Sequence, residues 1–419
     1  MPKERNQFVD IMRGVAMLLV VLWHTMTGST ANSQSSFLFN IVWSLQMPLF
    51  ILISGYVTRY SKEITGFGGL IKFLAKRTLA YLLPFAVWSF LIRGFILRQK
   101  VFFDFKYMLW HIDSGYWFLI TIWTISVIFG ISSLVSSLAK NTVTKQILLA
   151  AVYLCGMAGL AAVGYFAGMT FLGIKLTLYY MPFYFAGWLY GQYRDKIFAL
   201  KFGNNAVDII VAICAVLWIY LLTRANMFAL PDGGKYIIFR AGASLLGCIA
   251  VCGLLKGVFS KKSNGGGVPV CCVGRCPLAR NISYPLSVSE YGENGKSADS
   301  SFNKGKPVCC NELCDDSDNS NCDNKTCKFK QDHELLSLRE RIAGFFGFAG
   351  RESLVIYLMH GLFLNLLKTA EKVEFSSIPG ISLAFTNFII CALICFVIIR
   401  ILGSNRTLCR FLGVKGKTE

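Results

Sequence analysis

Charged residues are scarce in this sequence. They make up 16% of the 419 residues, whereas an average soluble domain holds about 25%. Hydrophobic residues reach 54%, and the mean hydropathy is +0.53. This balance excludes an ordinary water-soluble domain. It predicts an all-α protein that crosses a membrane several times.

Acidic residues are rarer than basic ones. The sequence has 23 Asp and Glu against 42 Lys and Arg, which gives a net charge of +19. Basic loops that face an anionic lipid leaflet account for such an excess, so no nucleic-acid partner is expected. Lys and Arg collect in the loops that lie on the inner side when the N-terminus is cytoplasmic. We therefore expect membrane lipids as surroundings and both termini in the cytoplasm.

Several functional motifs are also missing. The apolar part of the sequence contains no P-loop, no dinucleotide-binding glycine pattern and no metal-ligand spacing, so no metal is expected in this core. No cleavable signal peptide is evident, because the first apolar run holds Asp10 and Arg13 and lacks a small-residue cleavage site. We expect the first helix to be retained as an anchor.

Long apolar segments are what the sequence has in abundance. A spanning helix needs roughly 20 mainly apolar residues. A bundle of about ten transmembrane helices is the predicted fold. The candidate segments are 8–27, 36–57, 77–97, 116–137, 146–166, 172–192, 206–223, 236–257, 352–369 and 382–403.

The first candidate segment carries two ionisable residues, Arg13 and His24. Eleven positions at 100° each come to about 20° past three full turns, so the two share a helix face roughly 16 Å apart. Ionisable groups inside a spanning helix are costly and usually face a cavity or a partner. Alternatively, Arg13 pairs with Asp10 and extends to the interface, and His24 forms an interfacial hydrogen bond.

Four short motifs occur in order along the chain. Asp10, Arg13 and His24 form D-x-x-R-G with R-x10-H; Phe50, Ser54 and Gly55 end an apolar helix; Trp117, Phe118 and Leu119 begin another; and Ser353, Tyr357 and His360 form S-x-x-I-Y-x-x-H. In this order and spacing, the chain resembles the membrane-bound acyltransferase-3 family over roughly 8–257 and 340–403. Members of that family are multi-pass O-acyltransferases that modify sugars of bacterial surface polysaccharides.

The resemblance implies an integral O-acyltransferase of a bacterial-type plasma membrane. Its donor would be cytoplasmic acyl-CoA, with acetyl-CoA expected, and its acceptor a hydroxyl of a cell-surface, exported or lipid-linked carbohydrate. Two positions depart from the family pattern. Ala80 stands where many members have a second arginine after Arg77, and Gln46 stands where sugar-acetylating relatives often have a histidine. The first departure affects how donor phosphates are held, although Lys76 can substitute as a point charge.

Acyl transfer requires a base that takes the proton of the attacking alcohol, and a neutral histidine is the usual one. The sequence has four histidines, at 24, 111, 333 and 360. His24 is the predicted base. Asp10 and His360 are further catalytic candidates, and His360 has the alternative role of a hydrogen bond between helices.

Cations near the inner face are the candidates for binding the phosphates of CoA. Arg13, Lys76 and Arg77 lie on that side in the predicted topology. Lys76 and Arg77 have the alternative role of ordinary positive-inside anchors. Trp117, Ser54 and Tyr357 are the candidates on the acceptor side.

One segment differs in composition from the rest. From Gly265 to Phe329 the chain is polar and holds eight of the fifteen cysteines, with the near-repeats PVCCVGRC and PVCCNELC. Such a stretch is typical of a disulfide framework or of a metal-thiolate site. The charge distribution favours the cytoplasm and thiols, whereas the possible glycosylation sequences NIS and NKT favour a lumenal side.

We therefore expect three parts: a core of eight helices over 1–260, an irregular Cys-rich insert over 261–335, and two helices with a basic tail over 336–419. Two other functions remain open. A transporter or flippase for a polar or anionic solute would show internal repeats with broken helices. A membrane-anchored binding protein would present the insert.

Overall fold

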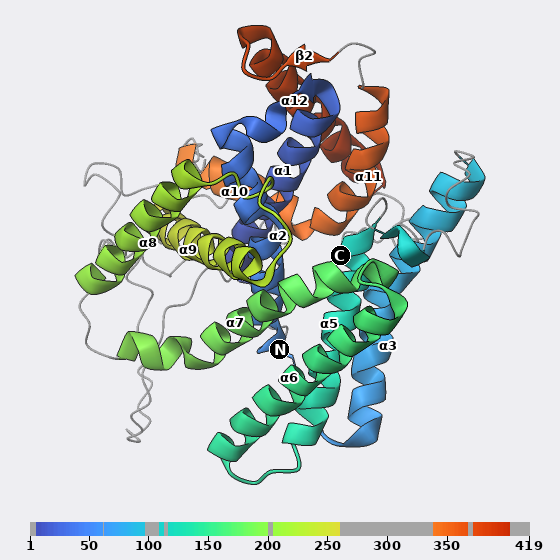
Figure 1. Ribbon diagram of the computed structural model, residues 1–419, viewed down its shortest axis with the longest axis vertical. Coiled ribbons are helices and arrows are strands. Elements are labelled where there is room, and N and C mark those ends of the chain that lie inside the picture. Colours follow the sequence, from blue (N-terminus) through green and yellow to red (C-terminus); the bar gives the residue numbers. More distant parts are fainter. Residues whose placement is uncertain are drawn as a thin grey trace, which may run out of the picture. The chain divides into compact units, whose positions relative to one another are not determined.

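The computed structural model is predominantly helical, as Figure 1 shows. It describes residues 6–61, 63–96, 109–112, 116–199, 204–259, 338–367 and 372–402. The elements are α1 Gln7–Ser29, β1 Thr30–Ala31, η1 Ser33–Ser35, α2 Phe37–Thr58, α3 Gly66–Ala86, η2 Val87–Ile96, α5 Trp117–Ser136, α6 Thr142–Ala167, η5 Phe171–Gly173, α7 Ile174–Ala199, α8 Asn204–Arg224, α9 Gly234–Phe259, α10 Leu338–Arg351, α11 Ser353–Leu366, β2 Val373–Glu374 and α12 Ile378–Leu402.

All of these elements belong to one structural unit, Met1–Ser260 with Leu336–Glu419. The expected Cys-rich insert, and with it His333, lies outside the described residues, so its boundaries and the state of its cysteines stay predictions.

Within the described residues, seven helices are long and apolar enough to cross a membrane: α1, α2, α5, α6, α8 from Ala206, α9 and α12 up to Ile401. The bent pair α10 and α11 brings the number to eight if it counts as one span. The other predicted segments, 77–97 and 172–192, are also helical, in α3 with η2 and in α7. Their composition is less apolar, because α3 contains Lys72, Lys76 and Arg77 and α7 is rich in tyrosine.

The predicted span 352–369 has a different structure. Helix α11 begins at Ser353, ends at Leu366 and meets α10 at an angle of 81°. Its 14 residues extend about 21 Å, which is short of the roughly 30 Å hydrocarbon core. The segment is therefore half of a broken span or of a re-entrant loop.

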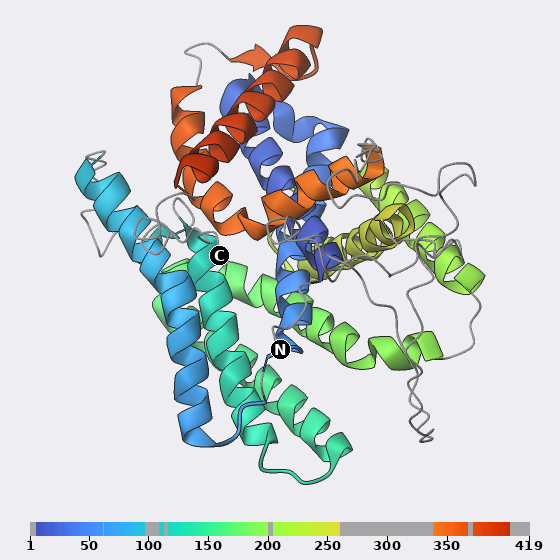
Figure 2. The same ribbon diagram turned by 180° about the vertical axis from the view of Figure 1, so that it is seen from behind.

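Helix α1 is the central element and packs against α2, α10, α11 and α12. Figures 1 and 2 show this arrangement as blue helices beside orange and red ones. The closest approach is between α1 and α10, where a Cβ added to Gly14 would lie 2.0 Å from the carbonyl oxygen of Phe346. A Cβ on Gly350 would lie 1.7 Å from the carbonyl oxygen of Asp10. Two glycines therefore permit backbone contact at the N-terminal half of α1.

A second glycine contact joins α2 to α7. A Cβ on Gly55 would lie 1.9 Å from the carbonyl oxygen of Tyr184, and one on Gly187 the same distance from that of Leu52. The Ser-Gly pair that ends the second motif thus serves close helix packing through its glycine.

The C-terminal end of α1 is tied to the segment before α12 by a short parallel strand pair. Thr30 pairs with Val373 and Ala31 with Glu374. Asn32 Nδ2 donates to Glu374 Oε1 at 2.7 Å, and Asn387 Nδ2 donates to Ser29 Oγ at 2.8 Å. These bonds fix the end of α1 and the α1–α2 connection to α12 and to the segment that precedes it.

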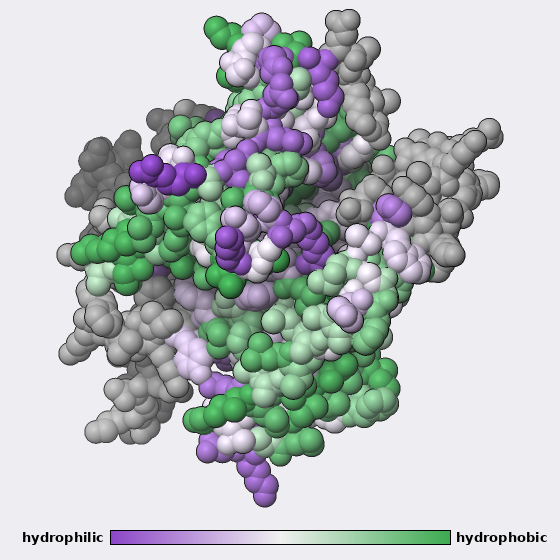
Figure 3. All heavy atoms as spheres, in the orientation of Figure 1, coloured by the Kyte–Doolittle hydropathy of each residue, from purple (hydrophilic) through white to green (hydrophobic). Residues whose placement is uncertain are grey.

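Large apolar side chains cover much of the surface of α6 and α8, as the green areas of Figure 3 show. Ile209, Ile213 and Val216 on α8 and Leu154 and Phe166 on α6 are more than half exposed. Exposed apolar surface of this extent fits contact with lipid chains.

Candidate functional site

The structure places His24 and His360 beside each other. His24 lies near the C-terminal end of α1 and His360 in α11, and their ring centroids are 4.9 Å apart at an interplanar angle of 49°. His360 is 4% exposed, and His24 is partly exposed. Two of the four histidines, separated by more than 300 positions in sequence, thus form a pair, which we call the histidine pair.

His360 is held in place by backbone groups. Its Nδ1 lies 3.0 Å from the carbonyl oxygen of Ile356, one turn earlier in α11. The thiol of Cys391 in α12 points to the carbonyl oxygen of His360 at 3.8 Å. The imidazole is therefore fixed by its own helix, and the helix is fixed by α12.

Aromatic rings surround the histidine pair. Trp23 meets His24 edge to face at 4.5 Å, and Tyr357 lies 5.7 Å from His360. Phe118 of α5 contacts Tyr357 at 5.5 Å and Phe50 of α2 at 5.2 Å. Such an environment keeps most water away from the His360 imidazole, which strengthens electrostatic interactions there.

Helix α5 is fixed to α11 beside this ring cluster. The hydroxyl of Tyr116 donates to the carbonyl oxygen of Leu358 at 2.9 Å. The third and fourth motifs of the sequence are therefore in direct contact, and the fourth motif meets the first at the histidine pair.

Arg13 lies on the same continuous helix as His24, so the predicted spacing of roughly 16 Å along the axis holds for α1. Arg13 is partly exposed, whereas Asp10 is only 3% exposed. Both flank the glycine contact with α10. Arg13 and Asp10 thus belong to the opposite end of the helix from the histidine pair.

The two cations of α3 differ in their surroundings. Lys76 is exposed, which fits an anchor. Arg77 is partly buried, donates to the hydroxyl of Tyr81 at 3.2 Å and stacks over Phe73 at 5.1 Å. Arg77 is therefore the cation of this pair that α3 holds in a defined position.

The acceptor-side candidates occupy separate places. Trp117 stacks on Tyr180 of α7 at 5.7 Å with an interplanar angle of 17°, and it touches Phe118 at 6.2 Å. Ser54 Oγ donates to the carbonyl oxygen of Phe50 at 2.9 Å, within its own helix. Tyr357 thus contacts the histidine pair directly, Trp117 connects to it through Phe118 and Tyr357, and the Ser54 hydroxyl is engaged inside α2.

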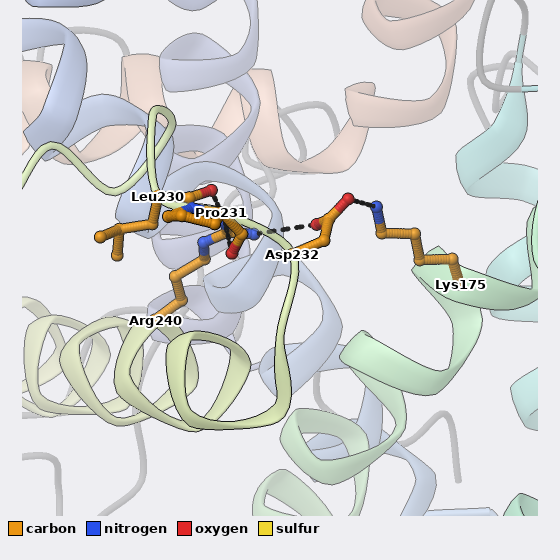
Figure 4. Close-up of polar contacts among 5 residues, drawn as sticks. All are labelled: Lys175, Leu230, Pro231, Asp232 and Arg240. Carbon is orange, nitrogen blue, oxygen red and sulfur yellow. Dashed lines mark hydrogen bonds and ion pairs between the residues drawn. The ribbon is translucent and has the colours of Figure 1, made fainter.

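A polar cluster that the sequence analysis did not identify lies at the start of α9 (Figure 4). Arg240 donates to the carbonyl oxygens of Leu230 and Pro231, and its Nη1 lies 3.8 Å from Asp232, which binds Lys175 Nζ at 2.6 Å. The hydrogen bond and charge of Lys175 hold the pKa of Asp232 below its usual range, and Arg240 adds to this effect. The signal in the sequence was Arg240 itself, an ionisable residue inside the predicted span 236–257.

The remaining histidine of the described chain, His111, is exposed and precedes α5. In the described ranges, no group of three or more His, Cys, Asp or Glu side chains is placed to hold a metal ion.

Comparison with known proteins gives two matches. A family model described as an acyltransferase domain matches residues 6–266. The nodulation protein NolL of Sinorhizobium fredii (strain NBRC 101917 / NGR234) is 26% identical over 204 residues, which cover 45% of this chain. The match spans about half of that relative's length, 50%. No solved structure matches the chain.

Proposed function

Because the chain belongs to the membrane-bound acyltransferase-3 family, we propose that it transfers an acyl group, namely acetyl, from acyl-CoA to a carbohydrate hydroxyl. The observation that carries this proposal is the histidine pair, in which His24 of the central helix α1 lies beside His360 of α11, with Arg13 on the same face of α1 toward its other end. A base and a cation at two depths suit a donor that is long and anionic at one end.

The chemistry at the histidine pair is proton transfer. As the acceptor oxygen attacks the thioester carbonyl, His24 takes the hydroxyl proton, and a new C–O bond forms. The C–S bond then breaks, and the leaving thiolate of CoA takes the proton from His24. The imidazole returns to its neutral form, so one base serves both halves of the reaction.

The donor is bound through its phosphates in this proposal. Arg13 offers a planar guanidinium that bonds two phosphate oxygens together, which an ammonium does not. Arg77 is the second cation, because Tyr81 and Phe73 fix its guanidinium, whereas exposed Lys76 contributes only charge. The pantetheine arm of CoA then extends along α1 toward His24.

The acceptor is an exported, cell-surface or lipid-linked carbohydrate of a bacterial-type plasma membrane in this proposal, with both termini of the chain in the cytoplasm. Trp117 and Tyr357 are the side chains we assign to its side of the reaction, because Tyr357 lies beside His360 and Phe118 joins Trp117 to Tyr357. A transporter, the alternative function, would contain such groups as well but would not require CoA.

The experiment uses membrane vesicles that contain the overproduced protein, acetyl-labelled acetyl-CoA, and the carbohydrate and glycolipid fractions of the producing cells as acceptor. We expect label in the carbohydrate fraction with wild type, and a loss of about 10²- to 10⁴-fold in His24→Ala, the usual value of a general base.

The matched control is His111→Ala, which removes an exposed histidine outside the pair and should leave the label unchanged. Absence of transfer by wild type would contradict the activity. Transfer by His24→Ala at the level of wild type would contradict the assignment of the base.

A further inference from the structure

We propose that Arg240, Ser244 and Tyr179 form a binding site for an oxyanion, the phosphate or carboxylate group of an acidic acceptor carbohydrate. The site lies between α7 and α9, on other helices than the histidine pair. Its assignment to the acceptor rests on the proposed acyl transfer, whereas the binding of an oxyanion does not.

Polar groups from two helices meet at this site. Arg240 and Ser244 are four positions apart in α9 and therefore share one face of that helix. The hydroxyl of Tyr179, in α7, lies beside Ser244 and within electrostatic range of Arg240. One guanidinium and two hydroxyls are thus brought together.

Three polar atoms of the site lack a partner. Arg240 Nε, Ser244 Oγ and Tyr179 Oη are buried, and none of them completes a hydrogen bond among the described residues. Ser244 is 0% exposed, yet its hydroxyl does not bond the carbonyl one turn earlier, as Ser126 does with Ile122 at 2.7 Å. A buried polar group without a partner is costly, so three together indicate that a group from outside the chain completes them.

The guanidinium of Arg240 is held in place through its other nitrogens (Figure 4). Its Nη2 donates to the carbonyl oxygens of Leu230 and Pro231, and its Nη1 lies 3.8 Å from Asp232 Oδ1. These contacts orient the group and leave Nε for a ligand. A binding site needs such fixed donors, because their order is then not lost on binding.

The charges around Arg240 favour an anion over a neutral hydroxyl. Asp232 lies between two cations, and it bonds Lys175 Nζ at 2.6 Å, much closer than it approaches Arg240. The positive charge of Arg240 is therefore only partly balanced. An N–H and two O–H groups can all donate to the oxygens of one phosphate or carboxylate, and bonds to a charged acceptor are the strong ones.

The site lies at the same end of the bundle as His24. Asn226, in the loop that leads to α9, donates from its Nδ2 to the carbonyl oxygen of Gln34 at 2.7 Å. Gln34 belongs to the connection between α1 and α2, which begins where the His24 end of α1 stops. Arg13 lies toward the other end of α1. The proposed reaction therefore has its donor phosphates at one end and this oxyanion at the other.

The ligand enters past the loop before α9. The three atoms are covered in this structure, so entry requires residues 225–233 to shift. Lys175 and Asp232 join this loop to α7, and their side chains are 49% and 66% exposed. An ion pair so exposed contributes little stability, so this contact can open at low cost.

The binding test is calorimetry of the full chain in an uncharged detergent, with three separate sugars: glucose 1-phosphate, glucuronate and glucose. We expect heat of binding with a charged sugar and none with glucose. Binding of the first alone would identify a phosphate, and binding of the second alone a carboxylate. Absence of binding by both charged sugars, or equal binding of glucose, would overturn the proposal.

Two variants remove the hydroxyls and keep the loop contacts of Arg240. Ser244→Ala and Tyr179→Phe should each weaken binding of the charged sugar roughly 10-fold or more, as for a lost hydrogen bond to a charged group. Their Tm should be unchanged or higher, because neither hydroxyl completes a bond within the described chain. Ser126→Ala, a matched control with a bonded hydroxyl, should bind like wild type. A lower Tm with unchanged affinity in both hydroxyl variants would show that the hydroxyls serve the fold and would refute the site.

The vesicle assay tests the link to acyl transfer. Ser244→Ala should raise the KM for the acceptor fraction and leave the KM for acetyl-CoA unchanged. Inactive wild-type protein that still binds a charged sugar would contradict the acyl transfer and leave the oxyanion site standing. Active wild-type protein with the same acceptor KM in both hydroxyl variants would contradict the assignment of the site to the acceptor.

Discussion

The glycine contact between α1 and α10 supports a quantitative prediction. In Gly350→Ala, the new Cβ would lie 1.7 Å from the carbonyl oxygen of Asp10 and 2.9 Å from the amide nitrogen of Gly14. Ordinary contact distances between heavy atoms are about 3.5–4.0 Å, so the helices must separate by roughly 2 Å. Overpacking of this kind typically costs about 1–3 kcal/mol.

The matched control is Gly344→Ala in the same helix, where an added Cβ meets nothing within 4 Å. Both substitutions gain about 0.5–1 kcal/mol of helix propensity, so the difference between them isolates the contact. We expect Gly350→Ala to be less stable than Gly344→Ala by about 1–3 kcal/mol.

The assay is thermal unfolding of both variants in one detergent, followed by circular dichroism and by the fraction that stays monodisperse. We also expect acyl transfer to fall in Gly350→Ala, because the displacement acts at Asp10 and Arg13. Equal unfolding temperatures for the two alanine variants would refute the close approach of α1 and α10.

Two further predictions concern charged groups. Arg13→Lys should raise the KM for acetyl-CoA roughly 10- to 150-fold, because a hydrogen bond to a charged group contributes about 1.5–3 kcal/mol. Calorimetry with free CoA should give a parallel loss of affinity, and wild-type binding by both Arg13→Lys and Arg13→Ala would contradict a role in donor binding. Asp232→Asn should lower stability slightly at neutral pH, by no more than about 1 kcal/mol for so exposed an ion pair. The folded-state pKa of Asp232 lies below its unfolded value of about 4, so this difference should shrink as pH falls through that window. A difference that grows at low pH would contradict the Lys175–Asp232 bond.

The helices of this chain could be predicted from the sequence because a helix that faces lipid needs a long run of mainly apolar residues, and such runs are visible in the composition. Each of the ten predicted segments coincides with helix over most of its described residues, although seven or eight rather than ten qualify as spans in the described part of the chain. The break between α10 and α11 was missed. Residues 338–351 carry charges and glycines, and their helix is stabilised by packing on α1, which a hydropathy pattern does not report.

The candidate site, like the fold, could be predicted from the sequence only in part. Spacing along one helix predicted that Arg13 and His24 share a face, because helix geometry is local. The resemblance to a family supplied His360 as a candidate, but no local rule places it beside His24. That contact depends on how α11 packs between α1 and α12, and the polar cluster of Arg240 depends on the path of the loop before α9.

The central position of α1 also has a consequence for biosynthesis. Its contacts at Gly14 and His24, and that of Asn32 just after its end, are with residues that follow more than 300 positions later, such as Glu374, which is 342 residues beyond Asn32. At about 5–20 residues per second, the ribosome needs roughly 20–70 s to make that length. During this time α1 must stay in the membrane with Asp10, Arg13 and His24 before α10, α11 and α12 exist. Helix α1 therefore waits for three of its final neighbours until late in synthesis, and the nascent protein depends on lipids, water or insertion machinery to shelter the polar groups of α1 until then.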